Sequence, residues 1–361
     1  MAKKSSIFAN FTGMMDGQTY NGTADADTIT TTFNNNTLNG GGGNDTISTT
    51  ITNRPDDLLI FQNGQGGQDV MSATVNAVAR YLGSVLDGGA AADTITTNTT
   101  LGNRFSDTLL ESYAVGGAGG DTISMTAALN GGGTLWQEAY GDDGDDNFTM
   151  LATATGGAGT TAYNYVEGDA GNDTMTATIS GADGSTVFNE LYGDDGVGSL
   201  FAPVSNDNLT GIVIGNNGAS YLYGGYGNDE LRATGGNGNE LYGGTGADTL
   251  HGSTGMDYFT GGSGIDTFYL GSGGNDIITD FDTGLLGTFL GADIIAFEPG
   301  VDYSLLDVVV GGEGALQITL GGNPIVTLAG TDSSLLGQVE GILDLALDLL
   351  GVGAPVTGEV G

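Results

Sequence analysis

The segment GGTGADTLHGSTGMDYFTGGSGIDTFYLGSGGNDII, residues 243–278, decides the fold. It places Asp248, Asp257, Asp266 and Asp276 nine or ten residues apart, each after glycines and each two residues before an apolar side chain. Glycine permits the positive φ angles of a tight turn, and alternation along a strand directs the apolar residue inward. The segment therefore predicts a repeated unit of one turn and one short strand.

The same pattern, G-G-x-G-x-D-x-U with U apolar, occurs thirteen times in the chain. GGGGNDTI at 40–47 and GGYGNDEL at 224–231 are good copies, and one copy is split between GDDG at 193–196 and the Asp at 207. A fixed period of this kind is the signature of a solenoid. The motif aspartates are Asp27, Asp45, Asp69, Asp93, Asp121, Asp146, Asp173, Asp207, Asp229, Asp248, Asp257, Asp266 and Asp276.

The spacing of the motif predicts the organisation of the chain. Toward the C-terminal end nine residues make half a coil, whereas the earlier coils take 24–28 residues and carry the motif in only one of their two turns. We expect an all-β, right-handed parallel β-roll or β-solenoid over residues 21–280, with one row of motif turns to about 228 and two rows over 229–280. Residues 1–20 are expected to form a cap or assembly arm, and 281–361 a C-terminal β/helix cap.

Composition indicates a fold that depends on a cation. The 361 residues include 44 Asp and Glu against 6 Lys and Arg, a net charge of −38, yet 39% are hydrophobic. High charge opposes collapse, and the chain's own basic residues are too few to neutralise it. The acidity also argues against nucleic acid and anionic membranes as partners, because both require basic patches. With no cysteine, disulfides and thiolate metal sites are excluded.

On these motifs the chain resembles the RTX (repeats-in-toxin) calcium-binding β-roll family, whose nonapeptide repeat is a known solenoid signature. The resemblance implies that several Ca²⁺ ions lie between stacked turns, held by Asp carboxylates and glycine carbonyls. Ala91, Thr23 and Asp25 depart from the motif glycines. The alternative for any single Asp is a turn former that caps its own backbone. The implied ligands are the thirteen aspartates above and Gly224, Gly227, Gly243, Gly246, Gly252, Gly255, Gly261 and Gly264.

The C-terminal segment resembles the tail of proteins exported by type I secretion. The runs ALQITL and PIVTLAG, joined by GGN, predict a β-hairpin, and residues 333–350 have a helical apolar face. We read that helix as a cap that is also part of an uncleaved export signal, with a partner-binding helix as the alternative. The start, MAKKSSIFANFTG, lacks the apolar core of a secretory signal, and no run of 18 apolar residues predicts a membrane span.

Two outward-facing rows are candidates for surface contacts. Positions one, three and five after each motif Asp form a threonine-rich grid that resembles ice-binding solenoids, although threonine also suits exposed strands in general. The other strands carry tyrosine and acid, as at Tyr165 and Glu167, which either stabilise the sheet or contact a neighbouring molecule or glycan. The surface-binding candidates are Thr28, Thr30, Thr46, Thr94, Thr96, Thr122, Thr174 and Thr176.

The sequence favours a structural role over an enzymatic one. His251 is the only histidine, and the motifs of metalloproteases, serine hydrolases and P-loop enzymes are absent. We expect a secreted, calcium-dependent protein that self-assembles into a surface layer, fibre or matrix, outside the cell or on a bacterial surface and exported without an N-terminal signal peptide. The alternative is a calcium-dependent adhesin that binds ice or carbohydrate through its threonine face. No nucleic acid partner and no membrane insertion are expected.

Overall fold

A computed structural model describes most of the chain, and its residues divide into two units. Unit 1 contains Met1–Leu191 and Val213–Gly218, and unit 2 contains Tyr192–Ile212 and Ala219–Gly361. The described residues are 8–9, 16–52, 57–102, 107–156, 159–194, 205–215, 218–270, 273–283, 292–297, 305–331, 333–336 and 338–339.

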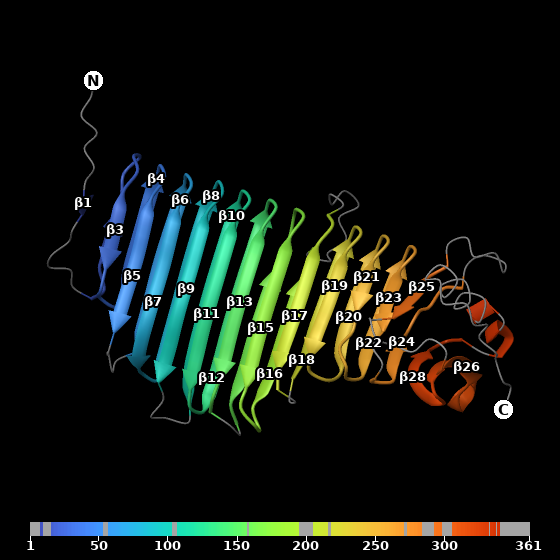
Figure 1. Cartoon of the computed structure of the whole chain (residues 1–361). Helices are drawn as coiled ribbons and strands as arrows, with labels where there is room; N and C mark the ends of the chain where they lie inside the picture. Colours follow the sequence, from blue (N-terminus) through green and yellow to red (C-terminus); the bar gives the residue numbers. More distant parts are fainter. Residues whose placement is uncertain are drawn as a thin grey trace. The chain divides into compact units, whose positions relative to one another are not determined.

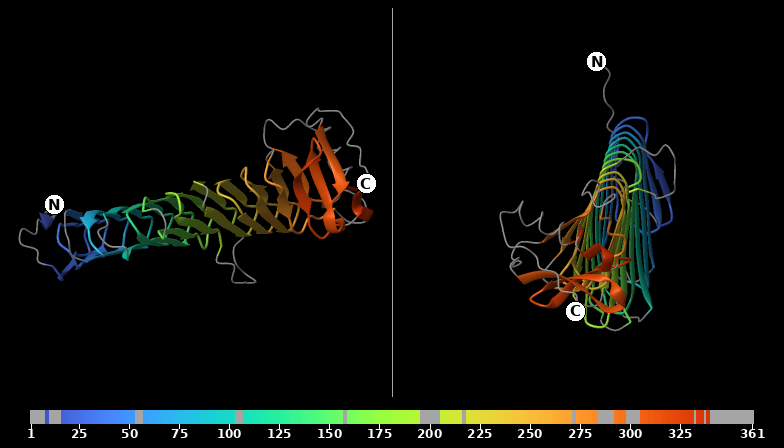
Figure 2. Two further views of the ribbon diagram at one scale, coloured as in Figure 1. Left: turned by 90° about the horizontal axis from the view of Figure 1, so that it is seen from below. Right: turned by 90° about the vertical axis from the view of Figure 1, so that its right-hand side faces the viewer.

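Unit 1 consists of coils that contribute one strand to each of two parallel sheets (Figures 1 and 2). Each strand pairs with the equivalent strand one coil away, so that Thr46 pairs with Thr28 on one side and Val70 on the other. The odd-strand sheet holds β1 (Phe8–Ala9), β3 (Thr28–Thr31), β5 (Thr46–Thr52), β7 (Val70–Val78), β9 (Thr94–Gly102), β11 (Thr122–Asn130), β13 (Asn147–Ala154) and β15 (Thr174–Gly181). The even-strand sheet holds β2 (Thr19–Asn21), β4 (Asn36–Gly42), β6 (Leu58–Gly66), β8 (Tyr81–Ala90), β10 (Thr108–Ala118), β12 (Gly133–Asp143), β14 (Thr161–Glu167) and β16 (Thr186–Tyr192).

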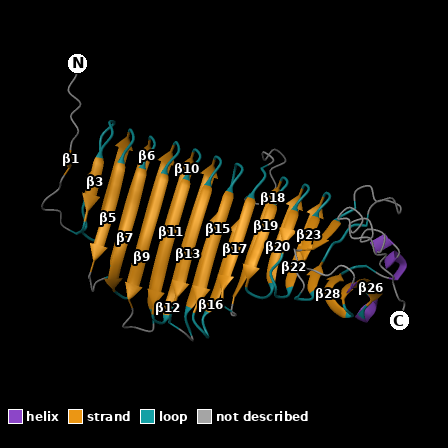
Figure 3. Ribbon diagram, in the orientation of Figure 1, coloured by secondary structure: helices purple, strands orange, loops and turns teal. Residues whose placement is uncertain are grey.

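Unit 2 repeats this arrangement with shorter strands (Figure 3), and it ends in antiparallel pairing. Its odd strands are β17 (Asn208–Ile214), β19 (Glu230–Gly235), β21 (Thr249–His251), β23 (Thr267–Leu270) and β25 (Ile294–Phe297). Its even strands are β18 (Gly218–Tyr226), β20 (Asn239–Thr245), β22 (Asp257–Ser263) and β24 (Asp276–Ile278), followed by β28 (Asn323–Leu328), β27 (Leu316–Leu320) and β26 (Leu306–Val310).

The core lies between the two sheets of each unit, where alternate side chains point inward. Ile47, Met71 and Ile95 stack in register from the odd-strand sheet, and each has no exposed surface. Leu86 and Leu241, two residues before their motif turns, are equally buried on the even-strand side. The predicted parallel β-roll is thus confirmed, because the apolar motif position fills the core in coil after coil.

A row of polar side chains also runs through the core of unit 1, which the apolar pattern did not predict. Ser84, Ser112, Gln137 and Asn164 occupy one register position on β8, β10, β12 and β14, and all are buried. Ser84 and Ser112 share a hydrogen bond of 3.1 Å, and the Asn164 amide donates to Oδ1 of Asn189 at 3.0 Å. Neither amide atom of Gln137 has a hydrogen-bond partner among the described residues.

The predicted C-terminal hairpin is present, since β27 and β28 pair antiparallel around Gly321 and Gly322. Two short 3-10 helices, η3 (Gly312–Gly314) and η4 (Ser333–Leu335), follow β26 and β28. Most of the helix predicted over 333–350 lies outside the described residues, as do residues 1–7 and 10–15 of the predicted N-terminal arm. In the described part of the chain, no helical segment combines the length and apolar character of a membrane crossing.

Candidate calcium site: a ladder of buried aspartates

The motif aspartates of unit 1 form a ladder along one edge, where each even strand turns into the next odd strand. Asp45, for example, sits between β4 and β5 and is buried. Its backbone N–H donates to Oδ1 of Asp69, one coil further along, at 2.7 Å. The same bond joins Asp27 to Asp45, Asp69 to Asp93, Asp93 to Asp121, Asp121 to Asp146 and Asp146 to Asp173, at 2.6–2.8 Å.

Unit 2 carries two such ladders. The first joins Asp207 to Asp229, Asp229 to Asp248, Asp248 to Asp266 and Asp266 to Asp293, at 2.8–3.1 Å. The second lies on the opposite turns, where Asn239 donates to Asp257 and the N–H of Asp257 donates to Asp276 at 3.0 Å. The structure therefore places Asp257 and Asp276 on a separate row from Asp248 and Asp266.

In most of these carboxylates the second oxygen is buried and open. While Oδ1 accepts the amide of the neighbouring coil, Oδ2 of these residues has no hydrogen-bond partner within the described part of the chain. A buried charged oxygen left in this state is costly, so it points to a ligand that completes it. This holds at Asp45, Asp69, Asp93, Asp121, Asp146, Asp229, Asp248 and Asp276.

The first glycine of the motif leaves room for this oxygen. A Cβ on Gly40 would collide with Oδ2 of Asp45 and with the carbonyl oxygen of Gly64 in the next coil. At Gly224 the same two kinds of oxygen, from Asp229 and Gly243, occupy the place of a side chain. Any larger residue would fill this cradle, in which a carboxylate and a carbonyl oxygen converge.

Burial raises the pKa of the ladder carboxyls, because the charged form loses water. The pKa of Asp146 rises to about 8, first through burial and then through the charges of Asp173, Asp121 and Asp142, although its hydrogen bond from Asp121 opposes the change. Burial also raises the pKa of Asp276 to about 8, with Asp257 as the next cause. The same first cause raises the pKa of Asp93 and Asp248 to about 7 and that of Asp45, Asp121 and Asp229 to about 6.

These features fit Ca²⁺. The ion prefers six to eight oxygen ligands and accepts carboxylate and backbone carbonyl oxygens together. Within the described ranges no three carboxylate or imidazole groups converge on one point, so carbonyl oxygens such as that of Gly64 must complete a site. The ion would be held by the open Oδ2 atoms and by the carbonyl oxygens of the first motif glycines. Its charge would offset the mutual repulsion of the ladder.

Two predicted ligands differ from the rest. The Thr23 hydroxyl and backbone N–H both donate to Oδ2 of Asp27, and the Ser253 N–H donates to Oδ2 of Asp257 at 2.6 Å. In both turns a hydroxyl residue stands where the motif has its second glycine. Here the carboxylate caps its own turn, as the alternative for a single Asp anticipated.

The predicted glycine ligands lie in the turns of unit 2. Gly224, Gly243 and Gly261 are first-position glycines whose missing Cβ faces a motif carboxylate. Gly252 is also a first-position glycine, and a Cβ there would meet both Phe259 and Oδ2 of Asp257, whereas a Cβ on Gly255 would meet the carbonyl of Gly236. Gly227, Gly246 and Gly264 adopt the positive φ angles that the turns require, 131°, 132° and 144°.

The motif search missed two members of the ladders. Asp293 ends the first ladder, where it accepts the N–H of Asp266 through Oδ1 and that of Asp282 through Oδ2 at 2.7 Å. The sequence ADII at 292–295 has the Asp-x-apolar end of the motif, but the motif glycines do not precede it. Asn239 takes the place of an Asp at the start of the second ladder. The motif does not mark Asn239 even with Asn allowed, because the glycines of GGNGNEL at 235–241 place Glu240 at the Asp position.

The threonine candidates lie in two exposed rows of the odd-strand sheet. Pairing places Thr94 opposite Thr122 and Thr96 opposite Ser124. Val70 and Asn147 interrupt the first row. All eight candidates keep the outward orientation, and the register joins Thr28, Thr46, Thr94, Thr122 and Thr174 in one row and Thr30, Thr96 and Thr176 in the other.

Comparison with known proteins agrees with this chemistry. A family model described as the RTX calcium-binding nonapeptide repeat matches four stretches, residues 19–50, 156–179, 206–240 and 234–268. No curated protein matches the chain. The matched stretches include the turns of Asp27, Asp45, Asp173, Asp207, Asp229, Asp248, Asp257 and Asp266. The chain therefore carries RTX calcium-binding nonapeptide repeats, and the ion that these repeats bind is Ca²⁺.

Proposed function

We propose that this chain is a secreted, calcium-dependent structural protein that self-assembles into a surface layer, a fibre or an extracellular matrix. The observation that carries the proposal is the unbroken register of outward side chains along the odd-strand sheet, from Thr28 to Thr174. A neighbouring molecule can repeat one contact at every coil of such a face. Many weak contacts in register then add to a strong association.

The proposed role is not enzymatic. The chain's one histidine, His251, is 7% exposed and stacks on Tyr269 with ring centroids 4.3 Å apart. It is buried on β21, although its position just before a motif glycine suggests a surface strand. The RTX repeats supply metal binding, and the matched stretches include coils of both units.

The proposed location is outside the cell or on a bacterial surface, after export by a type I pathway. At a net charge of −38 the chain repels itself where calcium is scarce, and millimolar calcium outside would drive folding because binding free energy becomes folding free energy. The same charge disfavours nucleic acid and anionic lipid as partners.

Calcium titration followed by circular dichroism and negative-stain electron microscopy tests this proposal. In EDTA we expect little β signal, and in millimolar Ca²⁺ a strong β signal together with ordered assemblies, with Mg²⁺ as the control ion. A β signal with dispersed monomers at high concentration would contradict self-assembly alone. A full β signal in EDTA would contradict calcium-dependent folding.

The threonine rows favour a second candidate, a calcium-dependent adhesin that binds ice or carbohydrate. Thr30, Thr96 and Thr176 are outward-facing members of one row, and rows on neighbouring strands repeat at about 4.8 Å. Thermal hysteresis of the calcium-loaded protein tests ice binding, and a glycan array tests carbohydrate binding. Thr96→Tyr should abolish either activity, while Thr96→Ser should retain most of it.

A further inference from the structure

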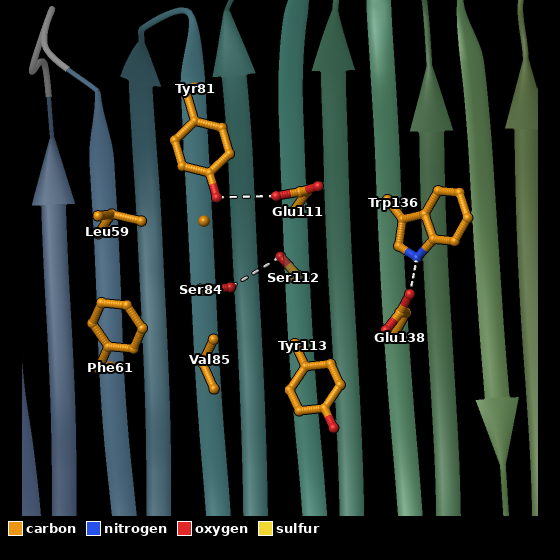
Figure 4. A pocket seen from close by; sticks show the side chains of 11 residues that line it. Leu59, Phe61, Tyr81, Ser84, Val85, Glu111, Ser112, Tyr113, Trp136 and Glu138 are labelled. Carbon is orange, nitrogen blue, oxygen red and sulfur yellow. Dashed lines mark hydrogen bonds between the residues drawn. The ribbon is translucent and has the colours of Figure 1, made fainter.

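A hollow of about 530 Å³ lies on the outward face of the even-strand sheet in unit 1, away from the aspartate ladder (Figure 4). Its centre is Gly83 on β8, which pairs with Leu59 of β6 on one side and with Glu111 of β10 on the other. The volume falls in the range of small-molecule sites. No part of the calcium chemistry above uses this face.

The hollow exists because position 83 has no side chain. A Cβ there would stand 2.6 Å from the Tyr81 hydroxyl oxygen and 3.1 Å from Cδ2 of Leu59. The Tyr81 ring therefore extends over the glycine, and its hydroxyl donates to Oε2 of Glu111 at 3.0 Å (Figure 4). This contact fixes one carboxylate at the side of the hollow.

The two sides of the hollow differ in chemistry. Leu59, Phe61 and Val85 form an apolar side, and the Phe61 side chain is 39% exposed. On the other side the aromatic rings of Tyr113 and Trp136 stand beside two carboxylates (Figure 4). Such a site offers a carbon-rich wall to one end of a ligand and negative charge to the other.

Both carboxylates accept hydrogen bonds from uncharged side chains. Glu111 accepts its bond from a tyrosine hydroxyl, and Glu138 accepts one from the indole N–H of Trp136, so both donors are neutral. None of the described residues that line the hollow is basic. Burial, followed by the charge of Glu138, raises the pKa of Tyr113, as expected in a negative field. Aromatic faces add a further attraction for cations.

We propose that this hollow binds a small organic cation, an ammonium or guanidinium group on an apolar stem. The stem lies against Leu59, Phe61 and Val85, and the cationic head faces Glu111 between the aromatic rings. A neutral sugar would bring no positive charge to the two carboxylates. A bare metal ion would find too few oxygens, because most of the lining is carbon.

The chain provides its own reporter, since Trp136 is its only tryptophan. Tryptophan fluorescence of the full chain in saturating calcium and at constant ionic strength is measured during titration with butylammonium, and in parallel with butanol, glucose and sodium. We expect a saturable change with butylammonium alone. An equal response to butanol or sodium, or a saturable response to glucose alone, would overturn the proposal.

Two variants test the geometry. Glu111→Gln removes the carboxylate and should weaken butylammonium binding about tenfold, while Gly83→Ala adds a methyl group at the centre of the hollow, displaces the Tyr81 ring and should weaken binding at least as much. Glu167→Gln is the matched control, because Glu167 accepts a bond of 2.9 Å from Tyr165 on the same sheet but does not line the hollow. Unchanged binding by Glu111→Gln, with the β signal intact, would overturn the proposal whatever Gly83→Ala does.

Discussion

The backbone N–H of Asp93 donates to Oδ1 of Asp121 at 2.6 Å, while Oδ1 of Asp93 itself accepts the N–H of Asp69 at 2.6 Å. One oxygen of each carboxylate thus joins neighbouring coils, and Oδ2 of both residues stays open. The two oxygens have separate roles, one in the protein's own hydrogen bonding and one in binding the ion. This separation allows the two roles to be tested apart.

Asp93→Asn should have opposite effects with and without calcium. The amide oxygen can still accept the Asp69 N–H, but the open anionic oxygen becomes an NH₂ group. In EDTA, where the parent chain is expected to be largely unfolded, we expect the folding equilibrium of the variant to shift toward the folded state by about 1 kcal/mol or more, because a buried charge is gone. In calcium we expect a lower melting temperature and about tenfold weaker binding at that turn. The circular dichroism β signal in EDTA, melting curves in calcium and calcium titrations measure these effects.

The control for this pair of measurements is Asp183→Asn, at an exposed turn position outside the ladder. It also replaces an aspartate by asparagine, and it should change neither the folding equilibrium in EDTA nor the calcium affinity appreciably. If Asp93→Asn destabilised the calcium-free protein as strongly as the calcium-loaded one, the separation of roles between the oxygens would be wrong.

The calcium-free protein should lose stability as the pH rises. Burial lifts the pKa of Asp146 to about 8 and that of Asp93 to about 7, from 3.8 for a free Asp side chain. A group with a raised pKa in the folded state favours folding while it is protonated, and this contribution disappears as the pH rises through the folded pKa. The expected stability is therefore highest near pH 4 and falls toward pH 8.

The circular dichroism β signal of calcium-depleted protein between pH 4 and pH 8 checks this expectation. Calcium and protons compete for the same oxygens, so calcium affinity should increase over the same range and binding should release protons. A β signal that rose with pH in the absence of calcium would contradict the burial of these carboxyls.

Ala91→Gly should stabilise the protein. Ala91 replaces a motif glycine and has φ of 79°, a left-handed conformation that costs a residue with a Cβ about 1 kcal/mol. Replacement with glycine should raise the free energy of unfolding by about that amount in calcium, as measured by urea denaturation. Ala90→Gly, one residue earlier in β8, is the control and should lower it by roughly 0.5–1 kcal/mol.

Gln137→Met should also stabilise the protein. The Gln137 amide is fully buried with no partner among the described residues, so an apolar side chain of similar size removes a desolvation cost of roughly 1–3 kcal/mol. Asn164→Leu is the contrasting variant, because the Asn164 amide donates to Asn189 and to the carbonyl of Thr178. Chemical denaturation should show a gain for the first and a loss for the second. A loss for Gln137→Met would mean that its amide is hydrogen-bonded in solution.

Much of this fold could be predicted from the sequence because each coil repeats the same local rule. The step from Asp45 to Asp69 set the length of one coil, and the apolar residues at 47 and 71 marked the core side of each strand. The thirteen aspartates could be placed on turns for the same reason. The ligand assignments themselves stay predictions, since residue spacing does not show which oxygen faces an ion.

The features that the sequence did not reveal depend on contacts between coils. Thr23 and Ser253 donate hydrogen bonds to Oδ2 of the aspartate in their own turns, so that oxygen is no longer open to an ion. The spacing of the aspartates gives no sign of these bonds. The polar row from Ser84 to Asn164 becomes visible only when the strands are aligned. The hollow at Gly83 likewise depends on the reach of the Tyr81 ring across the strand.

The ladder bond does not depend on how much chain separates its two ends. From Asp27 to Asp45 the separation is 18 residues and from Asp93 to Asp121 it is 28, yet the bonds measure 2.7 and 2.6 Å. Extra residues are absorbed in longer strands and in loops at the far turn. A gene of this type can therefore gain or lose whole coils by duplication or deletion, and each new coil will meet matching neighbours wherever it is inserted.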